Sequence, residues 1–311
     1  MPAAADLEIA KNLPPAGCSV EKASEYTRWL STSHYENFKI VSWLLPKRLH
    51  QHFYNVYAYC RWADDLGDEI PDPRVALKLL DAWDEELTSA YSGSPSHPVF
   101  IALAGTVREF DIPIDPFRDL LLAFRQDQRV HQYENWEGVL QYCRYSANPV
   151  GRLVLYLTGY RDPERQALSD ATCTALQLAN FWQDVARDLE KDRVYIPLDL
   201  LRANGLTRED LFHKNFDNRY VAVMKELAAR TRALFAQGAP LAATLSPEFR
   251  VDIEMFSRGG LAVLDGIESV GYDTLHRRPA ISRATQLKLL AGAVLGRAFS
   301  WMRPAAAPPK L

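Results

Sequence analysis

Apolar residues recur with helical spacing along almost the whole chain, and alternating runs of β-branched residues bounded by turns are nearly absent. This pattern predicts an all-α protein. Proline-containing segments separate several of the helical stretches, because proline lacks the backbone donor and restricts the residue before it. The predicted helices cover about residues 20–32, 35–45, 47–68, 73–91, 98–110, 115–126, 134–158, 163–190, 216–237, 246–272 and 282–302.

The connections between these helices are short, and no long Gly/Ser linker or internal repeat divides the chain. We therefore expect one helical domain over residues 20–303, with flexible ends at 1–19 and 304–311. A hydrophobic share of 48% over 311 residues is typical of a globular protein and excludes disordered and fibrous classes. The formal charge of -3 argues against a nucleic-acid-binding protein.

The four scattered cysteines form no CxxC pair, which favours free thiols in a reducing compartment. The sequence has no apolar segment with the length of a spanning helix and no signal-peptide pattern near residue 1. These features predict a cytoplasmic protein.

Two of the predicted helices carry a stripe of oxygen ligands. Tyr57, Arg61, Asp64 and Asp68 are spaced at i, i+4, i+7 and i+11, so they share one helix face. On the second helix, Asn180, Asp184 and Asp188 are spaced by four, with Gln183 and Arg187 beside them. Carboxylates one turn apart repel each other, and a cation normally offsets that repulsion.

Mg²⁺ is the cation that such stripes favour, because it prefers oxygen ligands and is often shared between carboxylates and substrate phosphates. Mn²⁺ has overlapping preferences. Facing stripes would clamp a diphosphate, and Arg61, Arg187 and Arg193 would bind its remaining oxygens.

The alternative is that both stripes are solvated helix surface, as acidic residues one turn apart often are. Buried-type residues around both stripes, among them Trp62 and Trp182, argue against that alternative. The acid-rich stretch from Asp81 to Glu86 has no partner stripe, and we expect it to be a solvated helix face.

Taken together, these motifs resemble those of the squalene and phytoene synthase family, from about residue 20 to 290. The resemblance rests on Asp64-Asp65-Leu-Gly-Asp68-Glu69, on Asn180-Phe-Trp-Gln183-Asp184-Val-Ala-Arg187-Asp188, and on Asp192-Arg193-Val-Tyr195. It implies an isoprenoid-synthase helical bundle with a central cavity, acting on prenyl diphosphates. Carried over by position, it implies that Asp64, Asp68, Asn180, Asp184 and Asp188 hold Mg²⁺.

The same resemblance implies that Tyr57, Arg61, Arg187 and Arg193 bind the diphosphate and that His34, Phe38 and Gln183 line the substrate cavity. It also implies that an arginine of the Arg277-Arg278-Pro279 stretch closes over the phosphate.

Two local segments, His34–Pro46 and Ser146–Gly151, resemble the bacterial hopanoid branch that converts presqualene diphosphate to hydroxysqualene. In that reaction a water ends the carbocation rearrangement, so NADPH is not expected. Glu36, Asn37, Tyr145 and Asn148 are polar candidates for orienting the water, although capping and buried hydrogen bonding are commoner uses of such residues.

Other readings of the sequence stay open. Within the family, the alternative is condensation of two farnesyl diphosphates to presqualene diphosphate or squalene. A noncatalytic assembly partner with this fold is a minor alternative, which the loss of a stripe aspartate would favour. Since the substrate is poorly soluble, we expect peripheral contact with the inner face of a membrane, and other hopanoid-pathway enzymes are candidate partners.

Overall fold

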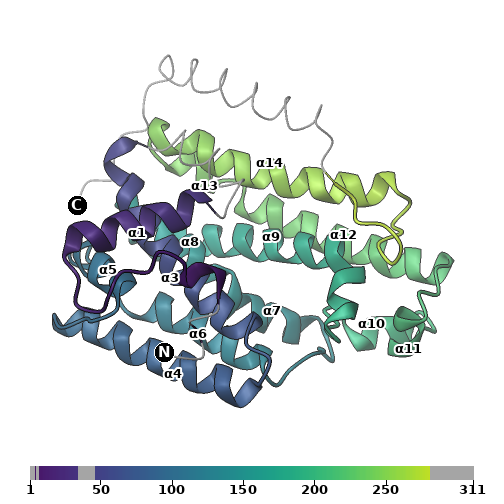
Figure 1. Cartoon of the computed structure of the whole chain (residues 1–311). Helices are drawn as coiled ribbons and strands as arrows, with labels where there is room; N and C mark the ends of the chain where they lie inside the picture. Colours follow the sequence, from purple (N-terminus) through teal and green to yellow (C-terminus); the bar gives the residue numbers. More distant parts are fainter. Residues whose placement is uncertain (1–3, 5–6, 34–45, 281–311) are drawn as a thin grey trace. The chain divides into compact units, whose positions relative to one another are not determined.

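The computed structural model describes residues 4, 7–33 and 46–280 (Figure 1). Within these ranges every regular element is a helix, apart from an isolated parallel bridge between Gln132 and Val194. This confirms the predicted all-α class. The helices predicted over 35–45 and 282–302 lie outside the described residues.

The chain divides into two compact units, Met1–Val130 with Pro149–Arg161 and His131–Asn148 with Asp162–Leu311. In the first unit, α3 packs against α1, α4, α5 and α6. Its side chains Tyr59 and Trp62 are fully buried against Trp83. The elements of this unit are η2 (Glu8–Ala10), α1 (Val20–Ser33), η3 (Lys47–Leu49), α3 (His50–Asp68), α4 (Pro73–Ser92), α5 (Pro98–Glu109), α6 (Asp115–Asp127) and nearly all of α8 (Asn148–Leu157).

In the second unit the long helix α9 (Pro163–Glu190) packs against α7, α12, α13 and α14. The other elements are α7 (Trp136–Ser146), α10 (Leu198–Ala203), α11 (Arg208–Phe212), α12 (Asn218–Gly238), α13 (Leu241–Thr244) and α14 (Pro247–Ser269). Each predicted acidic stripe therefore lies on a helix with many neighbours in its own unit, α3 or α9. Such helices position functional side chains more firmly than loops do.

Several prolines that separate the predicted helices turn out to lie in the first turn of a helix. Pro73 and Pro163 follow the aspartates Asp72 and Asp162, whose side chains accept backbone hydrogen bonds at the N-termini of α4 and α9. The first-turn N–H groups have no intrahelical acceptor, so proline loses nothing there, and each aspartate satisfies one of the remaining donors.

The predicted helix over 134–158 is wrong as a single element, because it is divided at Ala147 into α7 and α8. Pro149 explains the break: it has no N–H to continue the helix, and its ring clashes with the preceding turn. The short helices α10, α11 and α13 were not predicted. Helices of four to six residues bury too few side chains to give a periodic signal.

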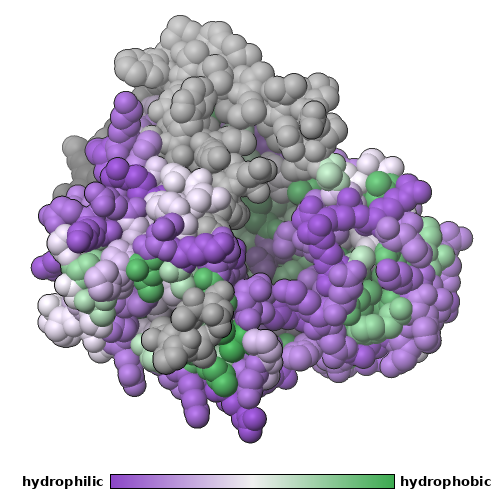
Figure 2. All heavy atoms as spheres, in the orientation of Figure 1, coloured by the Kyte–Doolittle hydropathy of each residue, from purple (hydrophilic) through white to green (hydrophobic). Residues whose placement is uncertain are grey.

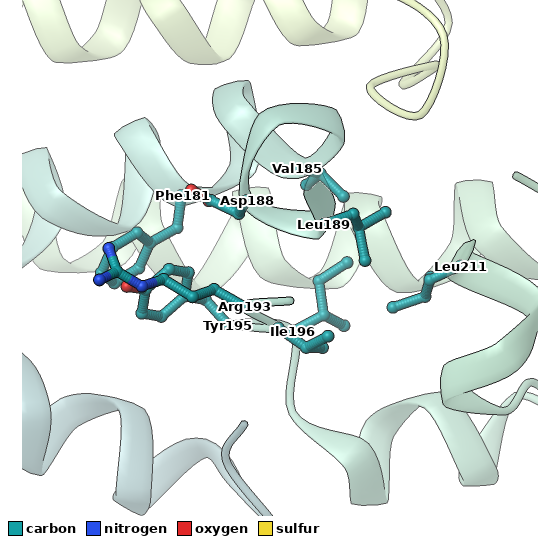
Figure 3. A pocket seen from close by; sticks show the side chains of 9 residues that line it. Phe181, Val185, Asp188, Leu189, Arg193, Tyr195, Ile196 and Leu211 are labelled. Carbon is teal, nitrogen blue, oxygen red and sulfur yellow. The ribbon is translucent and has the colours of Figure 1, made fainter. Parts of the chain in front are cut away.

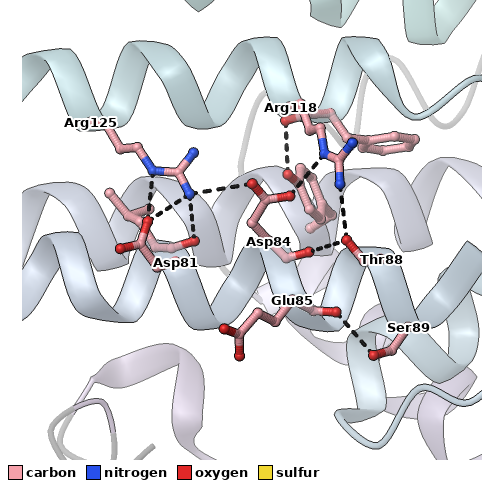
Figure 4. A network of polar contacts seen from close by, with 10 residues as sticks. Asp81, Asp84, Glu85, Thr88, Ser89, Arg118 and Arg125 are labelled. Atoms are coloured by element: carbon pink, nitrogen blue, oxygen red, sulfur yellow. Dashed lines mark hydrogen bonds and ion pairs between the residues drawn. The ribbon is translucent and has the colours of Figure 1, made fainter.

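The acidic stretch predicted to be a solvated face is exposed at Asp81 and Glu85, but Asp81 and Asp84 also pair with arginines of α6 (Figure 4). Arg125 contacts Asp81 at 2.9 Å and Asp84 at 3.4 Å, while Arg118 Nε donates to Asp84 Oδ1 at 3.1 Å. The partner cations lie more than 30 residues away in the sequence, so the α4 pattern alone gave no sign of them.

Glycines allow close helix packing in the second unit. A Cβ at Gly260 on α14 would lie 2.3 Å from Phe235 Cζ and 2.8 Å from Leu176 Cδ2. Phe235 belongs to α12 and Leu176 to α9, so Gly260 lies where three helices meet. At the adjacent Gly259, no heavy atom of the described residues outside its own stretch of helix lies within 4 Å of the Cβ position.

We therefore predict that Gly260→Ala lowers the free energy of unfolding by about 1–3 kcal/mol, because the added methyl forces the buried Phe235 ring to move. Gly259→Ala is the matched control and should leave stability unchanged or raise it by up to about 1 kcal/mol through helix propensity. Urea denaturation of both variants measures the difference. Equal stabilities would show that this packing contact is not tight.

Hydrophilic residues cover most of the described surface visible in Figure 2, with smaller apolar areas between them. Exposed large apolar side chains include Leu122, Val150 and Phe216. None of the helices in the described ranges combines the length and the apolar character that crossing a membrane requires.

Candidate active site

The first acidic stripe follows one face of α3. Tyr57, Arg61, Asp64 and Asp68 are all partly exposed, whereas Ala58 and its buried neighbours form the opposite face. Arg61 Nη1 lies 4.0 Å from Asp64 Oδ2. The helical geometry that the spacing predicted is therefore present, and the stripe faces outward from the core of its unit.

Asp65 belongs to this motif, although its spacing indicates no role for it. Its side chain is only 3% exposed, and its Oδ1 lies 2.5 Å from Arg61 Nη2. A buried carboxylate needs such a cation, and the ion pair fixes the guanidinium in return. Arg61 Nε is also buried, and no described residue accepts a hydrogen bond from it. This arginine thus has a donor left for a further anion.

We predict that Asp65→Asn lowers kcat/KM for a prenyl diphosphate by about 10–100-fold, the range typical of groups that orient a binding residue. The cause would be a less ordered Arg61, so a weaker affinity for inorganic diphosphate should accompany the loss. Glu85→Gln, which changes an exposed acid on the neighbouring helix α4 outside the motif, is the control. If Asp65→Asn keeps wild-type affinity and activity, Asp65 does not position Arg61 for function.

The second stripe lies on α9, where Asn180, Asp184 and Asp188 share a face that is exposed or partly exposed. Their rotation about the helix axis is set by buried residues on the other side. Trp182 is fully buried, and its Nε1 donates to Thr231 Oγ1 of α12 at 2.8 Å. Arg187 is exposed, and Gln183 is buried.

The Arg-Arg-Pro stretch contacts this stripe directly. Arg278 donates through Nε and Nη2 to the two carboxylate oxygens of Asp184, the second at 3.1 Å. Gln183 Nε2 donates to the backbone carbonyl of Pro279. Hydrogen bonding to Asp184 raises the pKa of Arg278, so the guanidinium stays charged. Of the two arginines that the resemblance left open, Arg278 is the one at the stripe.

Asp188 and Arg193 line one small pocket at the end of α9 (Figure 3). The aromatic rings of Phe181 and Tyr195 are stacked beside them, with centroids 3.7 Å apart. The segment after α9 reaches this position because Arg193 N donates to the Asp188 carbonyl at 2.8 Å. The preceding Asp192 adopts a left-handed conformation with φ of 57°, which reverses the chain at the end of the helix.

The remaining predicted residues are placed as follows. Tyr145 is partly exposed on α7. Asn148 is buried, and its Oδ1 accepts a hydrogen bond from Thr174 Oγ1 of α9 at 2.8 Å. This hydrogen bond joins the first residue of α8 to α9. His34, Glu36, Asn37 and Phe38 lie outside the described residues.

The candidate ligands of both stripes fit Mg²⁺, because they are side-chain oxygens of aspartate and asparagine. The contact of Asp184 with a guanidinium shows that its carboxylate accepts a cation. In the described ranges, no three His, Cys, Asp or Glu side chains lie close enough to hold a metal by themselves. Water and phosphate oxygens would complete the coordination, as is usual for Mg²⁺.

Comparison with known proteins matches residues 31–285 to the sequence profile of the squalene/phytoene synthase family. Hydroxysqualene synthase of Rhodopseudomonas palustris is 36% identical over 71% of this chain and 74% of its own length. Phytoene synthase of Thermus thermophilus is 33% identical over 89% of this chain and 93% of its own. The crystal structure of squalene synthase HpnC from Alicyclobacillus acidocaldarius, 41% identical, superposes with a TM-score of 0.79 over 85% of this chain and 99% of that one.

Proposed function

This chain belongs to the squalene/phytoene synthase family, whose members are prenyl diphosphate-processing enzymes, and we propose that it converts presqualene diphosphate and water to hydroxysqualene and diphosphate. The observation that carries this choice is the 36% identity to a hydroxysqualene synthase over most of both chains. The segment Ser146–Gly151, at the division between α7 and α8, supports the same branch through its resemblance to it.

The proposal assigns the metal ligands to both stripes: Asp64 and Asp68 on α3, and Asn180, Asp184 and Asp188 on α9. When bound, Mg²⁺ neutralises charge on the diphosphate leaving group. Tyr57, Arg61, Arg187 and Arg193 bind diphosphate oxygens directly, and the free Nε donor of Arg61 supports that role. These donors stabilise the charge that develops as the carbon–oxygen bond breaks.

The carbocation formed by loss of diphosphate needs an apolar wall that excludes stray water. The stacked rings of Phe181 and Tyr195 beside Asp188 and Arg193 are suited to this, because aromatic faces attract positive charge. Rearrangement opens the cyclopropane, one water forms the new carbon–oxygen bond, and its proton leaves. Gln183 lines the substrate cavity in this proposal. The candidates for orienting the water are Glu36, Asn37, Tyr145 and Asn148.

Conversion of presqualene diphosphate and water to hydroxysqualene and diphosphate requires no reductant, so NADPH has no part in the proposed reaction. We also propose that the poorly soluble substrate brings the protein into peripheral contact with the inner face of a membrane, where other enzymes of hopanoid synthesis would be partners. Flotation of the protein with liposomes tests that contact.

The alternative is condensation of two farnesyl diphosphates. The 33% identity to a phytoene synthase favours it, since the relatives of this chain are not confined to one reaction. Both functions need the same stripes, so the stripes do not distinguish them. The substrate that the protein consumes does distinguish them.

The experiment incubates purified protein with Mg²⁺, without NADPH, in parallel with presqualene diphosphate or farnesyl diphosphate. Mass spectrometry of the extracted lipids identifies the products. We expect presqualene diphosphate to be consumed and farnesyl diphosphate to remain. Consumption of farnesyl diphosphate alone would establish the condensing alternative, and inactivity on both under conditions that keep the protein folded would support a noncatalytic role.

A further inference from the structure

The contact between Arg278 and Asp184 is a two-point ion pair. Nε and Nη2 of the guanidinium each approach a different carboxylate oxygen of Asp184. The aspartate side chain is 14% exposed and the arginine side chain 41% exposed, so the pair is partly shielded from water. Bidentate pairs of this kind are among the stronger charge-assisted hydrogen bonds.

The segment that carries Arg278 is held in place on both sides of it. Before Arg278, the buried Thr274 hydroxyl lies 2.7 Å from the Tyr220 hydroxyl of α12. After Arg278, the Pro279 carbonyl accepts from Gln183. Arg278 Nη2 also donates to Gln183 Oε1 at 3.4 Å. The arginine is thus fixed on the stripe by its backbone as well as by its charge.

A guanidinium in this position and a divalent cation compete for the carboxylate oxygens of Asp184. The side-on pair occupies one lone-pair direction on each carboxylate oxygen, and its positive charge repels a second cation. The exposed Arg277 makes no comparable contact among the described residues, so the competition is specific to one of two adjacent arginines.

We propose that Arg278 is an internal competitor of the metal at Asp184 and sets the metal affinity of the second stripe. This inference rests on the proposed assignment of Asp184 as a metal ligand. Without metal, Arg278 neutralises the charge of the Asp184 carboxylate. Metal binding displaces the arginine and weakens the hold of α9 on residues 274–279.

Linkage makes this coupling reciprocal. If metal binding releases Arg278, then removal of Arg278 must strengthen metal binding by the same free energy. Breaking an ion pair of this exposure should change the metal dissociation constant by roughly fivefold to tenfold. The effect concerns the metal alone and requires no turnover.

The experiment measures Mn²⁺ binding to the full chain by electron paramagnetic resonance, without substrate, for the wild type, Arg278→Gln, Arg278→Lys and the control Arg277→Gln. Asp184→Asn, alone and combined with Arg278→Gln, identifies the Mn²⁺ bound at Asp184. We expect Arg278→Gln to bind Mn²⁺ roughly fivefold to tenfold more tightly, Arg278→Lys to be intermediate because it loses the bidentate geometry, and Arg277→Gln to match the wild type. The gain should vanish in the double variant.

Hydrogen exchange of peptides covering residues 274–280 tests the displacement directly. In the wild type, saturating Mn²⁺ should accelerate exchange there, whereas in Arg278→Gln exchange should be fast with or without metal. Equal Mn²⁺ affinities of wild type and Arg278→Gln, or exchange unaffected by Mn²⁺, would overturn the proposal. If Asp184→Asn shows that no Mn²⁺ depends on Asp184 in either background, the proposed metal site itself is wrong, which is a different result.

Discussion

Asp184→Ala is expected to abolish conversion of the prenyl diphosphate substrate, with a loss of at least about a hundredfold in kcat, because charge stabilisation of the leaving group depends on the stripe. Asp64→Ala, on α3, should have the same effect. Neither carboxylate belongs to the buried core, since the side chain of Asp64 is 50% exposed and that of Asp184 is 14% exposed. The helical circular dichroism spectrum should therefore stay largely intact while activity disappears.

The matched control is Glu190→Gln, which removes an exposed acid from the same helix as Asp184 but away from its face. It should keep wild-type turnover. Normal turnover by Asp64→Ala or Asp184→Ala would refute the assignment of the stripes as the metal and diphosphate site.

The second large effect concerns stability at acidic pH. Burial against Trp62, Trp83 and Phe100 lowers the pKa of His97 from 6.5 to about 4, and the charge of nearby Glu86 only partly offsets this. Between these two values the unfolded chain binds a proton that the folded chain does not. Stability should therefore fall as the pH is lowered from about 6.5 to about 4, by about 3 kcal/mol for this residue.

Urea denaturation at a series of pH values measures this loss, and His97→Asn isolates it. Asparagine can still accept at the start of α5, where His97 Nδ1 accepts from Val99 N, but it does not titrate. The variant will be less stable at neutral pH because the ring is lost. Its stability should nevertheless fall less steeply with acid, and a decline as steep as that of the wild type would show that His97 is not the group responsible.

The sequence predicted the fold well because helical periodicity is a local signal. The predicted helix over 163–190 coincides with α9, where an aspartate cap and a first-turn proline mark the start of the helix. Pro149 is a local signal for the division at Ala147, but apolar periodicity continues across it and predicts a single helix. The tight packing at Gly260 had none, because it depends on two other helices.

In the candidate site, too, features within one helix were predictable and contacts between distant residues were not. The residues of each stripe share a helix face as their spacing predicted, because all residues of one stripe belong to the same helix, α3 or α9. The ion pair of Asp65 with Arg61 is also within one helix, yet spacing alone did not reveal which aspartate was buried. The contact of Arg278 with Asp184 joins residues 94 positions apart, and nothing local distinguishes Arg278 from Arg277.

If water ends the reaction, the oxygen of that water becomes the hydroxyl oxygen of the product. The protein is incubated with presqualene diphosphate and Mg²⁺ in water enriched in ¹⁸O, and the extracted product is analysed by mass spectrometry. The expected product is hydroxysqualene that carries the ¹⁸O label. A hydrocarbon product, or an alcohol without the label, would contradict this expectation.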